Sequence, residues 1–142
     1  MLKGLDPLLG PDLLAALRAM GHGDEIVLAD ANFPAEALAR RLCRVDGVDA
    51  SRMAQAVLSV LPLDDFAPAA AFRMAVVGAP DSEPEIVDAF RAVLIEAGYA
   101  GPIEAIERLA FYDRARAAFA IVATGEMRLY GNLILRKGVI RL

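Results

Sequence analysis

The chain has 142 residues, of which 57% are hydrophobic, and its formal net charge is −4. Its length suits a single domain spanning residues 1–142, and its acidic balance, without a basic cluster interleaved with aromatics, argues against a nucleic-acid partner. The longest stretch without a charge, residues 53–63, is too short for a membrane span, which needs about 20 apolar residues. No secretory signal is recognisable, and the single cysteine cannot form an internal disulfide. We therefore expect a cytoplasmic protein.

The expected elements of the first half alternate between helix and strand. A helix is expected over residues 5–20, with a start signal of Gly, Pro and Asp at residues 10–12. A continuous apolar run at residues 26–29 predicts a strand that is covered on both faces. Two helices are expected over residues 34–43 and 51–61, the second capped by Asp49 or Ser51, with a short strand or hairpin turn between them.

The second half continues the alternation. Residues 63–70 form an expected loop with two acids, whose length is typical of a lid or a contact surface. Ser82 and Glu85 have the spacing of a capping box for a helix that runs to residue 97. The other expected elements are a helix over residues 108–117 and strands over residues 72–77, 103–106, 119–124 and 129–136. Strands alternating with helices predict an α/β fold, a three-layer α/β/α arrangement with a largely parallel central sheet.

Residues 21–34 are the most promising place for chemistry, because they hold the only histidine and several acids around the apolar run. Ligands gather beyond the carboxyl ends of parallel strands, so Asp30 is a natural ligand-facing residue, although it could also cap the following helix. His22 precedes the strand, between two glycines. The fold, or a neighbouring subunit, would have to bring His22 and Asp30 together. Judged by its position alone, a lone histidine of this kind more often has a structural role than a catalytic one.

Residues 20–34, with the sequence MGHGDEIVLADANFP, resemble the signature of the fucose mutarotase and ribose pyranase family, which interconverts ring forms of free monosaccharides. Residues 108–115, 119–126 and 130–132 resemble the same family in the same order, so the resemblance covers the whole chain. Asn32-Phe33 resembles the fucose branch more than the ribose branch, where a glycine and a leucine are expected.

The resemblance implies an isomerase, a mutarotase that interconverts the α and β anomers of L-fucose by acid/base ring opening and closure. It implies that His22 is the proton donor and that Tyr130 assists proton transfer. The sugar-binding residues that it implies are Asp30, Arg108, Tyr130, Gly131 and Asn132. These types suit the work, because imidazole exchanges protons near neutral pH and carboxylate, guanidinium and amide groups bind hydroxyls.

Without the resemblance, these residues have ordinary explanations. Arg108 would be a surface residue beside Glu107, Tyr130 a strand aromatic and Gly131 a bulge. We expect neither a metal nor another cofactor, because one histidine with scattered acids lacks ligand spacing. Cys43 is expected to be an inert thiol in the middle of a helix.

The resemblance also implies a homo-oligomer, a decamer of two pentameric rings with sites at subunit boundaries. The hydrophobic fraction agrees with extensive association, since about 45–50% is usual for soluble domains. Three alternatives stay open: a pyranase that interconverts the pyranose and furanose forms of ribose, a non-catalytic sugar-binding component of an uptake system, and a structural ring protein without a ligand.

Overall fold

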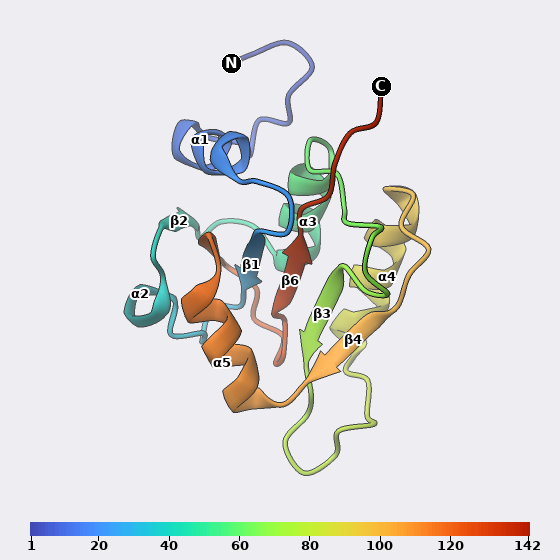
Figure 1. The fold of residues 1–142 in the computed structure, drawn as a ribbon. Helices are drawn as coiled ribbons and strands as arrows, with labels where there is room; N and C mark the ends of the chain where they lie inside the picture. Colours follow the sequence, from blue (N-terminus) through green and yellow to red (C-terminus); the bar gives the residue numbers. More distant parts are fainter.

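A six-stranded sheet with the order β2-β5-β1-β6-β3-β4 forms the middle layer of the computed structural model, which describes residues 1–142 (Figure 1). Strand β6 is antiparallel to both of its neighbours, β1 and β3, and every other pair is parallel. The strands are β1 (Glu25–Ala29), β2 (Leu42–Val45), β3 (Ala71–Met74), β4 (Ile103–Ile106), β5 (Ala120–Thr124) and β6 (Leu133–Arg136). The predicted α/β fold with a largely parallel sheet is confirmed.

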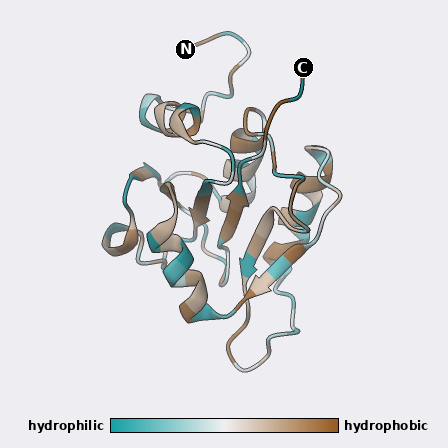
Figure 2. Cartoon of the chain, in the orientation of Figure 1, coloured by the Kyte–Doolittle hydropathy of each residue, from teal (hydrophilic) through white to brown (hydrophobic).

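Helices cover both faces of the sheet. The helices are α1 (Pro11–Ala19), α2 (Ala35–Leu38), α3 (Ala50–Leu58), α4 (Glu85–Glu96) and α5 (Arg108–Ala117). Successive residues of a strand point to opposite faces, so Ile26 and Leu28 of β1 join the core under α1, α3 and α4, while Val27 and Ala29 join the core under α2 and α5. The interior residues of the central strands β1, β5 and β6 are accordingly apolar, as Figure 2 shows for β1 and β6. No helix combines the length and the apolar character that crossing a bilayer requires.

Two predictions for the first half were wrong in part. The first helix begins at the Gly-Pro-Asp signal, with Pro11, and residues 5–10 are not helical. The helix expected over residues 34–43 ends after four residues, and the chain then forms the edge strand β2. Cys43 therefore lies in a strand, where its burial raises the pKa of the thiol. Pairing of β2 with β5, some 80 residues away, outweighs the local helical pattern.

Helix starts were predicted with mixed success. Asp49 caps α3, because its carboxylate accepts a hydrogen bond from the Arg52 amide at 2.8 Å. The capping box of Ser82 and Glu85 was wrong, since α4 begins after Pro84 without a side-chain cap. The Ser82 amide instead donates to the carbonyl of Ala79 in a turn. The last strand starts at Leu133, later than expected, because a tight turn precedes it.

The sheet has two ends with different contents. The carboxyl ends of β1, β3, β4 and β5 meet at one end, and the amino end of the antiparallel strand β6 joins them; we call this the carboxyl edge, at the bottom of Figure 1. The opposite end, which we call the amino edge, holds the loop before β1, the loop after α3 and the chain's carboxyl terminus.

Candidate active site

Asp30 and Asn132 form a paired unit at the carboxyl edge. The Asn132 side chain accepts a hydrogen bond from the Asp30 amide and donates one to the Asp30 carboxylate, both at 2.8 Å. The Asn32 amide donates to the other carboxylate oxygen at 3.0 Å, which forms a turn rather than the helix cap considered above. Burial raises the pKa of Asp30, although these hydrogen bonds oppose it. The fold thus joins two predicted site residues that lie 102 positions apart.

Glu126 supports this unit, and we did not predict a role for it. Its side chain is 3% exposed and accepts hydrogen bonds from the Arg128 amide and guanidinium at 2.9 Å and from the Ala50 amide at 3.2 Å. The Arg128 guanidinium holds the pKa of Glu126 below its usual value, against the effect of burial. The backbone carbonyl of Glu126 also accepts a hydrogen bond from the Ala31 amide. The available signal was an acid placed one glycine after a largely apolar strand.

Gly131 passes directly over Glu126. A Cβ atom at Gly131 would lie 2.5 Å from Cγ of Glu126 and 3.1 Å from the carbonyl of Arg128. A glycine is therefore required here by close packing, rather than by a strand bulge. The preceding residue, Tyr130, has a φ of 60°, which is unusual for a side-chain-bearing residue.

Arg108 reaches the same edge from another element. It is the first residue of α5, and its exposed guanidinium lies 5.7 Å from the centre of the Tyr112 ring. Tyr112 in turn contacts Phe33 edge to face at 5.5 Å, which connects Arg108 to the loop after Asp30. A neighbouring aromatic, Phe111, is completely buried in the core and lines no site.

A cavity of about 370 Å³ opens at the carboxyl edge beside Asp30 and Phe33, with Arg44 and Thr124 also in its wall. Neither Tyr130, Asn132 nor Arg108 lines it. The predicted sugar-binding residues therefore share an open edge of the chain rather than one closed pocket.

His22 lies at the opposite end, the amino edge. Its Nε2 atom is 3.1 Å from a carboxylate oxygen of Asp64, its side chain is 45% exposed, and Phe66 packs against its ring at 5.0 Å. Asp64 is buried, which by itself would raise the pKa of the carboxyl, but hydrogen bonds from the Phe66 amide and from His22 lower it overall. An ionised Asp64 can only accept a hydrogen bond, so Nε2 carries the hydrogen that is donated to it and Nδ1 is the free nitrogen. We did not predict Asp64 as a partner of His22; the two acids in the loop were its only signal.

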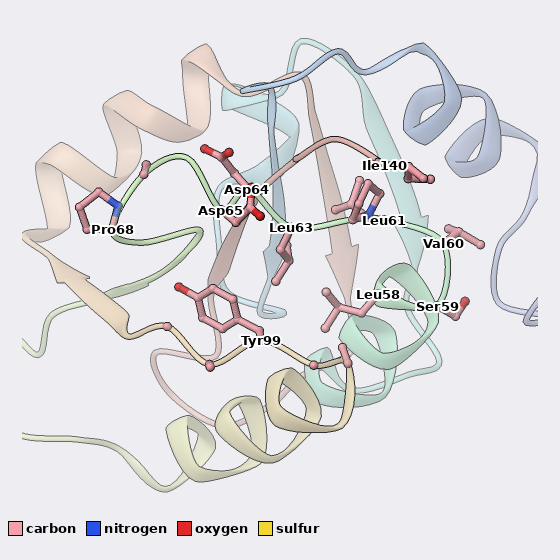
Figure 3. Close-up of a pocket in the computed structure, with 16 residues that line it drawn as sticks. Leu58, Ser59, Val60, Leu61, Leu63, Asp64, Asp65, Pro68, Tyr99 and Ile140 are labelled. Atoms are coloured by element: carbon pink, nitrogen blue, oxygen red, sulfur yellow. The ribbon is translucent and has the colours of Figure 1, made fainter. Parts of the chain in front are cut away.

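A larger cavity, of about 660 Å³, lies at this end as well (Figure 3). It lies between the loop after α3 and the end of α4, with Asp64, Tyr99 and Ile140 in its wall. It contains none of the predicted sugar-binding residues. The Tyr99 hydroxyl is already used, because it donates to the Pro102 carbonyl and accepts from the Ala70 amide.

His22 and Asp30 are thus not brought together within one chain. Strand β1, with five residues, separates them, and at about 3.3 Å per residue it spans roughly 16 Å. No group of three or more histidine, cysteine or acidic side chains is assembled that could hold a metal ion.

Comparison with known proteins gives a consistent result. Residues 3–140 match the RbsD / FucU transport protein family. The chain is 46% identical to a fucose mutarotase of Homo sapiens, an alignment that covers 99% of this chain and 96% of that protein. It is 39% identical to an L-fucose mutarotase of Actinobacillus pleuropneumoniae, with 98% and 97% covered. The crystal structure of the Streptococcus pneumoniae fucose mutarotase in complex with L-fucose superposes with a TM-score of 0.93 at 42% identity, with 99% and 100% covered.

Proposed function

Because the chain belongs to the RbsD / FucU family, we propose that it is a fucose mutarotase, an isomerase that interconverts the α and β anomers of L-fucose. Relatives that are 39% and 46% identical over nearly the whole chain have this activity in their names, and one similar structure contains L-fucose. The observation that carries the proposal for this chain's own residues is the buried Asp30–Asn132 pair at the carboxyl edge, beside Tyr130 and Gly131.

This pair has unused capacity for a sugar. Each carboxylate oxygen of Asp30 accepts one hydrogen bond within the protein, and each has a further lone pair for a hydroxyl. The Asn132 amide keeps one N–H for the same purpose. Arg108, which is exposed at the start of α5, adds a planar group of donors. The Tyr130 ring supplies an apolar face for the sugar ring, and its hydroxyl a proton to exchange.

The chemistry needs two proton transfers. A proton leaves the anomeric hydroxyl and another reaches the ring oxygen as the C1–O5 bond breaks, which produces the open aldehyde. The aldehyde turns about its bond to C2 and recloses on the other face, with the two transfers reversed. His22 takes the anomeric proton on its free Nδ1 as the ring opens and donates it back when the ring closes, while Asp64 holds Nε2–H. The Tyr130 hydroxyl donates its proton to the ring oxygen as the C1–O5 bond breaks and recovers it when the ring closes.

His22 has to come from a second copy of the chain, since β1 separates it from Asp30. We therefore propose a homo-oligomer, such as the expected decamer of two pentameric rings, in which the amino edge of one subunit faces the carboxyl edge of the next. Exposed apolar side chains agree with such contacts at both edges: Phe66 and Ile140 at the amino edge, Val77 and Leu129 at the carboxyl edge. We also propose that the protein acts in the cytoplasm, in keeping with its single free cysteine.

Exchange NMR on L-fucose tests the function. The enzyme should speed α/β exchange well above the buffer blank, and exchange no faster than the blank would refute the proposal. His22→Ala should still be stabilised by L-fucose in a thermal melt but should lose exchange. Normal exchange in His22→Ala would remove His22 from the mechanism.

Mixed oligomers test the shared site. His22→Ala and Tyr130→Phe should each be slow alone. If the two residues act in one site from different subunits, unfolding and refolding them together should restore about a quarter of the wild-type sites in a random assembly. If the exchange rate of the mixed oligomers does not exceed the sum of the rates of the two variants, His22 and Tyr130 do not act in one site from different subunits.

Two of the three alternatives are separated from this function by measurements of sugar binding and exchange. A ribose pyranase would exchange D-ribose faster than L-fucose. A non-catalytic component of an uptake system, which would fit a family of transport proteins, would bind sugar without speeding exchange at all.

A further inference from the structure

A tight turn after β3 contacts the Tyr130 hydroxyl. Residues 76–79 form this turn: the Ala79 amide donates to the Val76 carbonyl at 3.1 Å, and Gly78 has a φ of +78°. A positive φ at the third position defines a type II turn, with Val77 at the second position. The Val77 amide takes no part in the turn and donates to the Tyr130 hydroxyl oxygen at 3.2 Å.

We propose that the Val77 backbone amide is a positioning group for Tyr130 in the mutarotase reaction; this inference rests on the proposed function. A phenol has one proton to donate and two lone pairs that accept. With the Val77 N–H on one lone pair, the Tyr130 proton is directed away from the protein, toward a sugar oxygen. The same N–H stabilises the negative charge that develops on the phenol oxygen while its proton is shared.

The backbone of Tyr130, at the opposite end of the residue from its hydroxyl, is also held in place. A left-handed conformation costs a side-chain-bearing residue roughly 1–2 kcal/mol, so it persists only where its surroundings enforce it. Glu126 binds Arg128 on one side of Tyr130, and Asn132 binds Asp30 on the other. The Val77 contact supplies the third fixed point, at the far end of the side chain. Backbone and hydroxyl are therefore both set before a sugar arrives.

The turn itself makes a clean test possible. Proline is favoured at the second position of a type II turn and removes only the N–H. Val77 is exposed, and its amide makes no other hydrogen bond. Val77→Pro should therefore fold normally, and Val77→Ala, which trims the side chain but keeps the N–H, is the matched reference.

Relative to Val77→Ala, we expect Val77→Pro to lower kcat for L-fucose exchange roughly two- to tenfold, with a smaller change in KM, since one hydrogen bond is lost. In a Tyr130→Phe background the same proline should have no further effect. Equal kcat for the two Val77 variants, or an equal loss in the Tyr130→Phe background, would overturn the proposal.

Hydrogen exchange tests the contact without any assay of activity. Tyr130→Phe should raise deuterium uptake in a peptide covering residues 75–82, because the Val77 amide loses its acceptor. Unchanged uptake would refute the contact. If Tyr130→Phe raises uptake as expected but the wild-type protein does not speed L-fucose exchange, the contact stands and the proposed function is refuted.

Discussion

Replacement of Glu126 should cost the protein a large part of its stability, although the residue takes no part in the proposed chemistry. Its carboxylate joins the end of β5, the first turn of α3 and the turn before β6. The partners differ in exposure: the Ala50 amide is completely buried, while the Arg128 side chain is 37% exposed.

The magnitude follows from those partners. In Glu126→Ala the Ala50 amide stays buried without an acceptor, which costs about 1–3 kcal/mol. Loss of the hydrogen bonds from Arg128 adds about 1–2 kcal/mol, a value reduced because water can solvate the half-exposed guanidinium. We expect a total of about 3 kcal/mol in the free energy of unfolding. Glu126→Gln, which keeps one acceptor oxygen, should cost less.

Urea unfolding at a fixed protein concentration measures this difference. Glu36→Gln is the matched control, because Glu36 is exposed and its ion pair with Arg44 is worth under about 0.5 kcal/mol. The pKa of Glu126 lies below its usual 4.5, so its contribution is complete above about pH 4.5 and is lost as the pH falls through the lowered value. The Glu126→Gln protein should therefore lose less stability on acidification than the wild type. A loss of less than about 1 kcal/mol in Glu126→Ala, or the same acid sensitivity in Glu126→Gln and the wild type, would refute this reasoning.

Three further predictions concern single residues. Arg73→Met should be neutral or raise the melting temperature, because this buried guanidinium has an unpaired Nε and only a 3.3 Å bond to the Ser82 carbonyl; a clear fall in Tm would contradict this. Gly131→Ala should lower the free energy of unfolding by about 1–3 kcal/mol and abolish stabilisation by L-fucose, since its Cβ would overlap Glu126. A variant whose melting temperature in the presence of L-fucose equals that of the wild type would disprove this. Asp64→Asn should slow L-fucose exchange roughly tenfold or more with sugar binding retained, because His22 loses its charged acceptor; an unchanged rate would rule Asp64 out.

Much of the fold was predictable because its signals are local. Strand β4 and helix α5 have the predicted bounds, and β1 is covered on both faces as its unbroken apolar run indicated. The predictions failed where a distant partner decides. Residues 42–45 pair with β5, and residues 129–132 turn tightly over Glu126 before β6 begins. Local periodicity carries no record of either contact.

The candidate site shows the same division. The amino-acid sequence by itself determined which side chains are chemically suited to the task, His22, Asp30 and Tyr130 among them, and that strands alternate with helices. Only the tertiary structure decided their neighbours: Asp30 with Asn132, His22 with Asp64, and the Tyr130 hydroxyl with the Val77 amide. The reason is physical, since an extended strand of five residues holds its two ends roughly 16 Å apart, while the antiparallel strand β6 carries residues from the far end of the chain to the carboxyl edge.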